Sequence, residues 1–138
     1  MEHTGYLDIN IEWRIQMSSI PQQEVIKTIV KALDSKRGED IKAVNIRDIT
    51  IIADYFIIAG ASSTTQAKAL ADAVEYELGK LGIQPTRTEG YSAANWIILD
   101  YTDIVVHVFY KETRDLYKLE KLWSDGVFVD ISEYIKPD

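Results

Sequence analysis

The sequence contains no cysteine, and its two histidines, His3 and His107, lie far apart along the chain. A disulfide framework and a cysteine-based metal site are therefore excluded, and no His-x-x-x-His pair is available for zinc. No apolar run approaches the roughly 18 residues that cross a bilayer. The N-terminus has neither a basic-then-apolar signal peptide nor an Arg-rich, acid-poor transit sequence. These absences predict a cytoplasmic protein with no metal, no cofactor and no membrane partner.

Basic residues are the minority among the charges: 15 Lys and Arg against 22 Asp and Glu give a net charge of −7. Affinity for nucleic acids comes largely from Lys and Arg side chains that displace counterions from phosphates. The basic spots, such as Lys36-Arg37, are short and lack interleaved aromatic residues. We therefore expect little or no direct contact with RNA. A partner protein would be basic, because opposite net charges speed the encounter and favour the right partner.

The length of 138 residues, 46% of them hydrophobic, suits one domain with a substantial core. Residues 1–17 show no clear periodicity and are interpreted as an N-terminal extension, with a single domain from 18 to 138. A first helix is predicted from Ser19, with Gln22 at capping-box spacing, to a stop at Gly38. Ile26, Ile29, Val30 and Leu33 would form its apolar face.

The rest of the chain alternates strand and helix patterns. The strand at 54–59 is apolar on both faces and is therefore expected at the centre of the sheet. The predicted elements, in chain order, are a strand at 43–46, the strand at 54–59, a break at Gly60-Ala61, a helix capped by Ser63 and Gln66 and ended by Gly82, an edge strand at 85–89, a hairpin within 96–109, a helix at 112–124, and a tail at 127–131 that docks back as an extra strand. This order predicts an α/β fold in which helices pack on a mixed sheet of about five strands.

The segment beginning at Trp96 offers the best candidate interaction surface. Successive side chains of a strand point to opposite faces, so Trp96, Ile98 and Asp100 share one face, whereas Ile97, Leu99 and Tyr101 share the other. A row of Trp, aliphatic and carboxylate is unusual for a core, because an unpaired buried Asp is costly. It suits a protein-binding surface with an aromatic anchor and a charge. In the alternative interpretation, Trp96 packs inside and Asp100 only begins a turn.

Other polar residues have structural explanations beside the chemical ones. His107 lies among apolar neighbours, which favours a hydrogen-bonded core histidine over a catalytic one. Asp100 and Asp103 bracket a turn, where acidic residues bond to the backbone, and a divalent-metal pair is the alternative. The stretch 60–63 precedes a helix N-terminus, which can hold an anion, but helix capping explains Ser63 without a ligand.

From about Val44 to Asp125 the chain closely resembles the ribosomal silencing factor (Iojap) family. The positions that carry the resemblance are Asp54-Tyr55-Phe56, Ser63, Gln66, Ala71-Asp72, Gly82, Pro85, Glu89-Gly90, Trp96, Asp100, Asp103, His107-Val108-Phe109, Arg114, Tyr117, Leu119-Glu120 and Leu122-Trp123. Two positions depart from the family pattern. The family tends to have glycine where Ala61 stands, and often has glycine in the hairpin turn where this chain has Thr102. Because a β-branched residue tolerates positive φ poorly, we expect a slightly different turn geometry.

The resemblance implies a translational repressor that binds the large ribosomal subunit through ribosomal protein fourteen and sterically blocks joining of the small subunit. Trp96, Ile98 and Asp100 would then contact the partner, with Glu89 and Tyr101 as neighbours. A homodimer is a further expectation, since family members are often dimers. Large-subunit assembly and a dimeric protein-binding scaffold are the alternatives.

The family fold is similar to that of nucleotidyltransferases, which makes a metal-dependent enzyme the remaining alternative. Those enzymes hold two metal ions with Asp-x-Asp or Asp-x-Glu on a strand. No strand here offers that spacing. The expectation is therefore a binding protein and not an enzyme.

Overall fold

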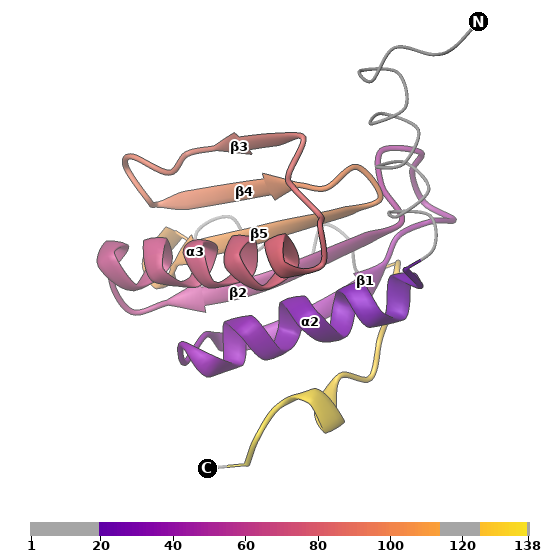
Figure 1. Cartoon of the computed structure of the whole chain (residues 1–138), viewed down its shortest axis with the longest axis horizontal. Coiled ribbons are helices and arrows are strands. Elements are labelled where there is room, and N and C mark those ends of the chain that lie inside the picture. Colours follow the sequence, from indigo (N-terminus) through magenta and orange to yellow (C-terminus); the bar gives the residue numbers. More distant parts are fainter. Residues whose placement is uncertain (1–19, 114–124, 138) are drawn as a thin grey trace, which may run out of the picture.

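The computed structural model of the chain describes residues 20–113 and 125–137. Its elements are α2 (Gln22–Ser35), β1 (Glu39–Asn45), β2 (Tyr55–Ala61), α3 (Thr64–Lys80), β3 (Arg87–Glu89), β4 (Trp96–Asp100), β5 (Ile104–Tyr110), β6 (Val127–Phe128) and the 3₁₀-helix η1 (Ser132–Tyr134). The strands form one sheet in the order β3-β4-β5-β2-β1-β6 (Figure 1). β2 and β5 run parallel, and the other neighbouring pairs run antiparallel. The predicted α/β class with a mixed sheet is confirmed, with six strands where about five were expected.

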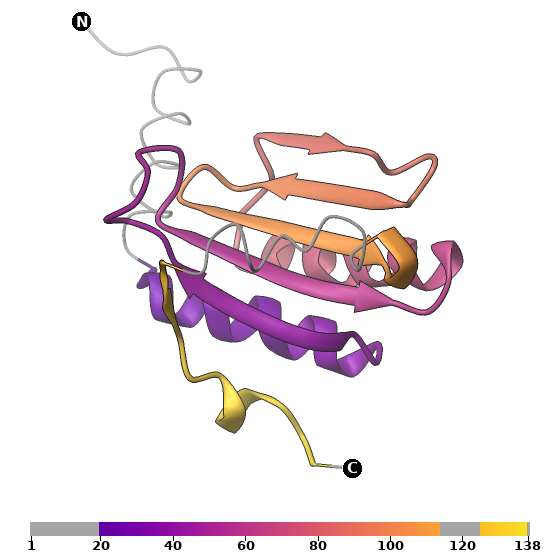
Figure 2. The same cartoon turned by 180° about the vertical axis from the view of Figure 1, so that it is seen from behind.

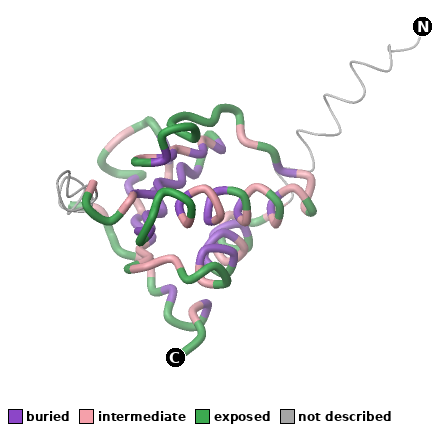
Figure 3. Tube along the Cα trace, turned by 90° about the vertical axis from the view of Figure 1, so that its left-hand side faces the viewer, coloured by how far each residue is buried: buried purple, intermediate pink, exposed green. Residues whose placement is uncertain are grey.

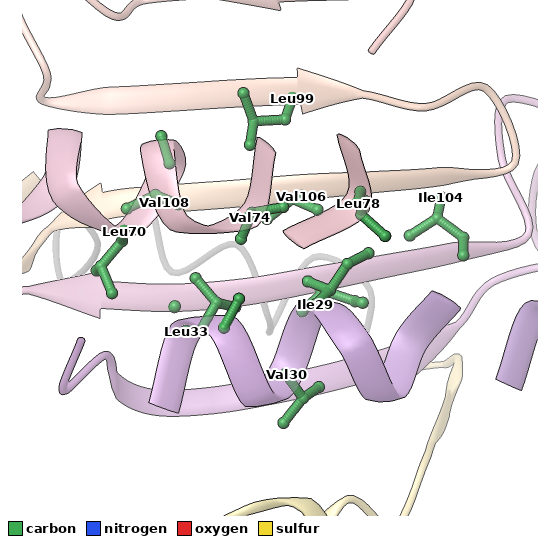
Figure 4. Packing of buried hydrophobic residues seen from close by; sticks show 14 of the residues in the cluster. Ile29, Val30, Leu33, Leu70, Val74, Leu78, Leu99, Ile104, Val106 and Val108 are labelled. Atoms are coloured by element: carbon green, nitrogen blue, oxygen red, sulfur yellow. The ribbon is translucent and has the colours of Figure 1, made fainter. Parts of the chain in front are cut away.

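Helices α2 and α3 lie side by side on the same face of the sheet, and the view from behind shows them beyond the strands (Figures 1 and 2). Their inner sides are buried while their outer sides are exposed (Figure 3). In the core, Leu70 and Val74 of α3 and Leu33 of α2 pack towards Val106 and Val108 of β5 (Figure 4). Burial of each such side chain contributes about 1.5 to 3 kcal/mol, so this two-layer contact is the main source of stability. None of the described helices is long and apolar enough to span a membrane.

Helix α3 begins and ends where its sequence signals predict. The Ser63 hydroxyl accepts a hydrogen bond from the Gln66 amide at 3.0 Å, as an N-cap does. The Gln66 side chain differs from the usual capping box: its Oε1 accepts from the amide of Ser62 at 2.6 Å instead of from that of Ser63. At the other end, Gly82 has φ of +81°, and Ile83 donates to the Leu78 carbonyl, which forms a Schellman motif.

Helix α2 differs from the prediction at both ends. Pro21 is the N-cap residue without a side-chain capping bond, and Ser19 lies outside the described residues. The helix ends at Ser35 in a second Schellman motif, in which Arg37 and not Gly38 takes the positive φ, +63°. Gly38 follows as the residue whose amide donates to the Leu33 carbonyl at 2.8 Å. The predicted stop at Gly38 was therefore three residues late, because the motif extends past the last helical residue.

The central strand is β2, as its two apolar faces predicted, since it lies between β5 and β1. The predicted break at Gly60-Ala61 is wrong, because both residues continue β2 and pair with Phe109 and Tyr110 of β5. β1 begins earlier than expected, at Glu39, and contains an irregularity between Glu39 and Lys42.

The tail returns to the sheet as expected, because Val127 and Phe128 pair with Asn45 and Val44 of β1. η1 then packs against α2, where Tyr134 is buried. The predicted helix at 112–124 lies mostly outside the described residues, as does the predicted extension at 1–17. The domain boundary near residue 18 stays a prediction.

Candidate protein-binding face

The strand register assigns the candidate residues to two faces. Residues directly opposite each other in neighbouring strands share a face, and Trp96, Ile98 and Asp100 lie opposite Phe109, His107 and Val105. Across the next pair, Val105 and His107 lie opposite Phe56 and Ile58 of β2. We call this side, which packs separately from the helix-covered core, the far face. Its members are Arg87, Glu89, Trp96, Ile98, Asp100, Val105, His107, Phe109, Phe56, Ile58 and Val44.

The alternation predicted for β4 is present in the burial of its side chains. Ile97 and Leu99 are fully buried in the core beneath the helices, whereas Trp96, Ile98 and Asp100 are partly exposed on the far face. Tyr101 is only 3% exposed and belongs to the helix-side core. Its burial raises the pKa of the phenol well above its usual range. Because a surface partner cannot reach it without rearrangement, Tyr101 is a poor candidate for contact.

The Trp96 indole is held by neighbours on the far face. It stacks on the Phe109 ring with centroids 4.9 Å apart and an interplanar angle of 24°. Its Nε1–H donates a hydrogen bond to Nδ1 of His107 at 3.1 Å. The backbones of Gly90 and Trp96 also lie close together, so that a Cβ atom built on Gly90 would be 2.1 Å from the Trp96 carbonyl oxygen. The alternative interpretation, in which Trp96 packs inside, is therefore correct in part: the indole contacts Phe109 and His107, and it is also partly exposed.

The Asp100 carboxylate also makes contacts within the chain. Its Oδ1 accepts a hydrogen bond from the Thr102 amide at 2.8 Å, as expected of an acidic residue that begins a turn. Its Oδ2 lies 3.7 Å from Nη2 of Arg87, and the same guanidinium has its Nε 2.8 Å from Glu89. The side chains of Arg87, Glu89 and Asp100 are 67%, 49% and 25% exposed. Exposed ion pairs contribute about 0 to 1 kcal/mol, so both carboxylates can exchange Arg87 for a cation of a partner.

The hairpin turn adopts the conformation that threonine should disfavour. Thr102 has φ of +76°, and the Asp103 amide donates to the Tyr101 carbonyl at 3.0 Å, which closes a three-residue γ-turn. The Asp103 carbonyl then accepts from the amides of Asp54 and Tyr55 at the start of β2. Thr102 thus adopts a left-handed φ that a β-branched residue tolerates poorly, and the turn is held by backbone hydrogen bonds to both flanking strands.

His107 is a buried, hydrogen-bonded core histidine, as its apolar neighbours indicated. It is 5% exposed, and its ring meets Phe56 edge-on at 4.5 Å. Burial lowers the pKa of His107 from 6.5 to about 4, so the imidazole is neutral at pH 7. Within the described residues, its Nε2 has no hydrogen-bond partner. Nor does any group of three or more His, Asp or Glu side chains in those residues gather closely enough to hold a metal ion.

Comparison with known proteins identifies the family of the chain. The family model described as ribosomal silencing factor during starvation matches residues 19–138. The chain belongs to this family. It is 40% identical over 110 residues to the ribosomal silencing factor of Bacillus subtilis, which covers 80% of this chain and 93% of that protein.

Solved and more distant members of the silencing-factor family agree with this assignment. A crystal structure of a protein from Chromobacterium violaceum superposes with a TM-score of 0.74 at 33% identity and covers 76% of this chain and 88% of that one. A mouse protein named for mitochondrial assembly of the ribosomal large subunit is 31% identical over 108 residues, or 76% of this chain and 47% of its own length. Family membership therefore supports a role in ribosome silencing.

Two features of the structure were not predicted from the sequence, one at the site and one in a loop. Arg87 could be placed beside Asp100 only once the register of the short edge strand β3 was known. The loop between β1 and β2 exposes Ile49, Ile51 and Ile52, which are 41%, 104% and 67% exposed. These three isoleucines within four residues were visible in the sequence, but an apolar run of that kind is more often a buried strand.

Proposed function

We propose that this protein represses translation by binding the large ribosomal subunit through ribosomal protein fourteen and sterically blocking the joining of the small subunit. The observation that carries the proposal is the partly exposed row of Trp96, Ile98 and Asp100 on the far face, in a chain of the silencing-factor family. The row combines an aromatic anchor, an aliphatic flank and a carboxylate, the mixture found at protein–protein hot spots.

The charges of the far face fit a basic protein partner. Glu89 and Asp100 lie at its β3 edge, and the chain as a whole carries a net charge of −7. Ion pairing of these carboxylates with Arg or Lys would orient the complex and speed its formation, while the phosphate backbone of rRNA would be repelled. The proposed contact set is therefore Trp96, Ile98, Asp100 and Glu89, with a protein and with little direct rRNA contact. Tyr101 is left out because it is buried.

The decisive experiment is co-sedimentation of the full chain with purified large and small subunits, followed by a subunit-joining assay. We expect the protein to pellet with large subunits alone and to reduce the fraction of joined ribosomes. Binding to small subunits alone, or binding to large subunits with unchanged joining, would contradict the proposal. Cross-linking of the bound complex should identify ribosomal protein fourteen as the neighbour of the far face.

Substitutions on the far face locate the contact. Ile98→Ala and Glu89→Lys change partly exposed or exposed side chains and should weaken large-subunit binding by about tenfold each. The matched control is Tyr76→Ala on α3, which removes a 67% exposed aromatic from the opposite side of the molecule and should leave binding unchanged. Equal effects of Ile98→Ala and Tyr76→Ala would show that the far face is not the contact.

Trp96 needs a milder test than truncation. Trp96→Ala removes the aromatic anchor and should abolish large-subunit binding. Because the indole stacks on Phe109 and bonds to His107, its removal also costs stability. Trp96→Phe retains an aromatic ring over Phe109. The change in its large-subunit binding should be compared with the change in its melting temperature.

Large-subunit assembly is the second candidate function, favoured by the name of the mouse relative. It predicts accumulation of immature large subunits when the protein is depleted from cells, whereas silencing predicts normal maturation and increased joining under starvation. The predicted cytoplasmic location belongs to the silencing proposal, because mature subunits are its target.

A homodimer would appear in analytical ultracentrifugation of the free protein. Heat on titration with a magnesium nucleotide would favour the enzymatic alternative.

A further inference from the structure

The indole N–H of Trp96 is already used inside the protein. The Trp Nε1 carries one hydrogen and can only donate, and this hydrogen points to Nδ1 of His107 at 3.1 Å. A partner could take the bond over only by displacing His107, which is 5% exposed. The part of the indole that Trp96 can offer outward is therefore its carbon skeleton.

The hydrogen bond also determines the state of the imidazole. Because Trp Nε1 is the donor, Nδ1 of His107 must be the unprotonated acceptor, and the proton of the neutral ring lies on Nε2. The ring is fixed from the side by Phe56, at 4.5 Å and an interplanar angle of 61°. The residues opposite His107 in the neighbouring strands are Ile98 and Ile58, both apolar. Nothing in this register competes for Nδ1.

Stacking alone would not fix the orientation of the indole. The χ2 torsion of an aromatic side chain has a broad, roughly two-fold profile, and a flipped indole could still lie over Phe109. A flip would, however, move Nε1 to the other side of the ring and break its bond to His107. Of the two orientations about χ2, the bond to His107 therefore selects the one that directs Nε1 towards Nδ1.

We infer that His107 is a positioning residue: it fixes the Trp96 indole in one orientation on the far face, so that ring carbons and not the N–H group meet the partner. The recess that receives Trp96 is then apolar and has no acceptor for the indole N–H. The statement about the recess rests on the proposed function, whereas the positioning is a property of the free protein and is tested separately.

The first test is NMR spectroscopy of the full chain labelled with ¹⁵N. An N–H···N hydrogen bond transmits a measurable ¹⁵N–¹⁵N coupling, so a cross-peak should join Nε1 of Trp96 to Nδ1 of His107. The three indole signals, from Trp13, Trp96 and Trp123, are distinguished by their loss in Trp-to-Phe variants. A Trp96 indole that lacks the coupling and exchanges its hydrogen as fast as a free indole would overturn the inference.

The second test compares two substitutions whose side chains have the same branching and the same number of heavy atoms. In His107→Asn, Oδ1 occupies roughly the place of Nδ1 and can accept the bond, whereas His107→Leu removes the acceptor. Both lose the imidazole packing against Phe56, so the difference between them reports the acceptor. We expect His107→Asn to keep a single, protected Trp96 signal. His107→Leu should show hydrogen exchange at least about tenfold faster and large-subunit binding about three- to tenfold weaker than His107→Asn.

Equal indole exchange and equal binding in the two variants would overturn the inference. A difference in exchange without a difference in binding would overturn the role in recognition. If His107→Leu does not fold, the coupling in the unmodified chain and the behaviour of His107→Asn still decide the positioning. If the unmodified chain does not bind large subunits at all, the proposed function fails while the NMR result stands on its own.

Discussion

Replacement of Gly90 by alanine should strain the connection that leads into the candidate binding row. Gly90 has φ of +78°, and a Cβ atom built on it would lie 2.1 Å from the Trp96 carbonyl oxygen and 3.2 Å from its carbonyl carbon. The neighbouring atoms are backbone, so no flexible side chain can move aside. Either the loop or the start of β4 must shift, and Trp96 would shift with it.

The two costs can be estimated separately. An alanine in the left-handed region costs about 1 to 2 kcal/mol, and relief of an overpacked contact costs about 1 to 3 kcal/mol. Gly90→Ala should therefore lower the free energy of unfolding by about 2 to 5 kcal/mol. A domain of this size has a total stability of about 5 to 15 kcal/mol, so a large part of the population would become sensitive to mild denaturant.

Gly79→Ala is the matched control. Gly79 lies within α3, has an ordinary φ, and a Cβ atom there would meet only the Gln84 side chain, at 3.8 Å. Alanine is favoured over glycine in a helix, so this variant should be more stable than the unmodified chain by about 0.5 to 1 kcal/mol. The same chemical change at two glycines thus has opposite predicted signs.

Urea titrations followed by far-UV circular dichroism would measure both variants, with the m-value as a check that the transition remains two-state. A Gly90→Ala variant within about 0.5 kcal/mol of the unmodified chain would refute the reasoning, because neither a positive φ nor a contact at 2.1 Å could then exist at that position. A destabilised Gly79→Ala would show instead that α3 tolerates no added methyl group.

Three further predictions concern the far face and its turn. His107 has a pKa of about 4 in the folded chain against 6.5 when solvated, so the unfolded state binds more protons between these values and stability should fall by roughly 3 kcal/mol as the pH falls from 6.5 to 4; urea titrations across this range should show a shallower decline for His107→Asn. Thr102→Gly should raise the free energy of unfolding by about 0.5 to 1 kcal/mol, because glycine accepts φ of +76° without strain; a lower melting temperature would contradict the strained turn. Arg87→Gln frees Glu89 and Asp100 for a basic partner and should strengthen large-subunit binding about two- to fivefold at low salt; weaker binding, with no change in a Lys80→Gln control, would show that Arg87 itself contacts the partner.

The sequence predicted the elements that local patterns encode. Period-two alternation placed Ile97 and Leu99 on one face and Trp96 and Ile98 on the other, because a strand has no other way to orient its side chains. Gly82 marked the end of α3 because its motif requires a positive φ. At α2 the same motif uses Arg37, which no propensity would select, and the predicted end was wrong there.

The contacts between strands could not be predicted in the same way. The bond from Trp96 to His107 is diagonal across β4 and β5, so it depends on the register set by the turn at 101–103. The ion pair of Arg87 with Asp100 depends on an edge strand of three exposed residues, which carries no hydrophobic pattern. The proposed partner and activity rest on the family resemblance, because no spacing of residues encodes the identity of a ribosomal protein.

Among the strands of residues 20–113 and 125–137, β2 and β5 form the one parallel pair, and this pairing has a consequence for the order of folding. The chain between these strands, residues 62–103, contains α3, β3 and β4, so their pairing requires closure of a long loop. The β4–β5 hairpin needs only the short turn at 101–103 and can form early. Phe56 comes from β2 and His107 from β5, so their ring contact waits for the slow closure. The contacts of Trp96 with Phe109 and His107 lie within the hairpin and can form early, whereas the packing of Phe56 on the His107 ring is completed only when β2 pairs with β5. A nascent chain would therefore acquire the fully positioned indole, and with it the proposed affinity for ribosomes, only after this closure.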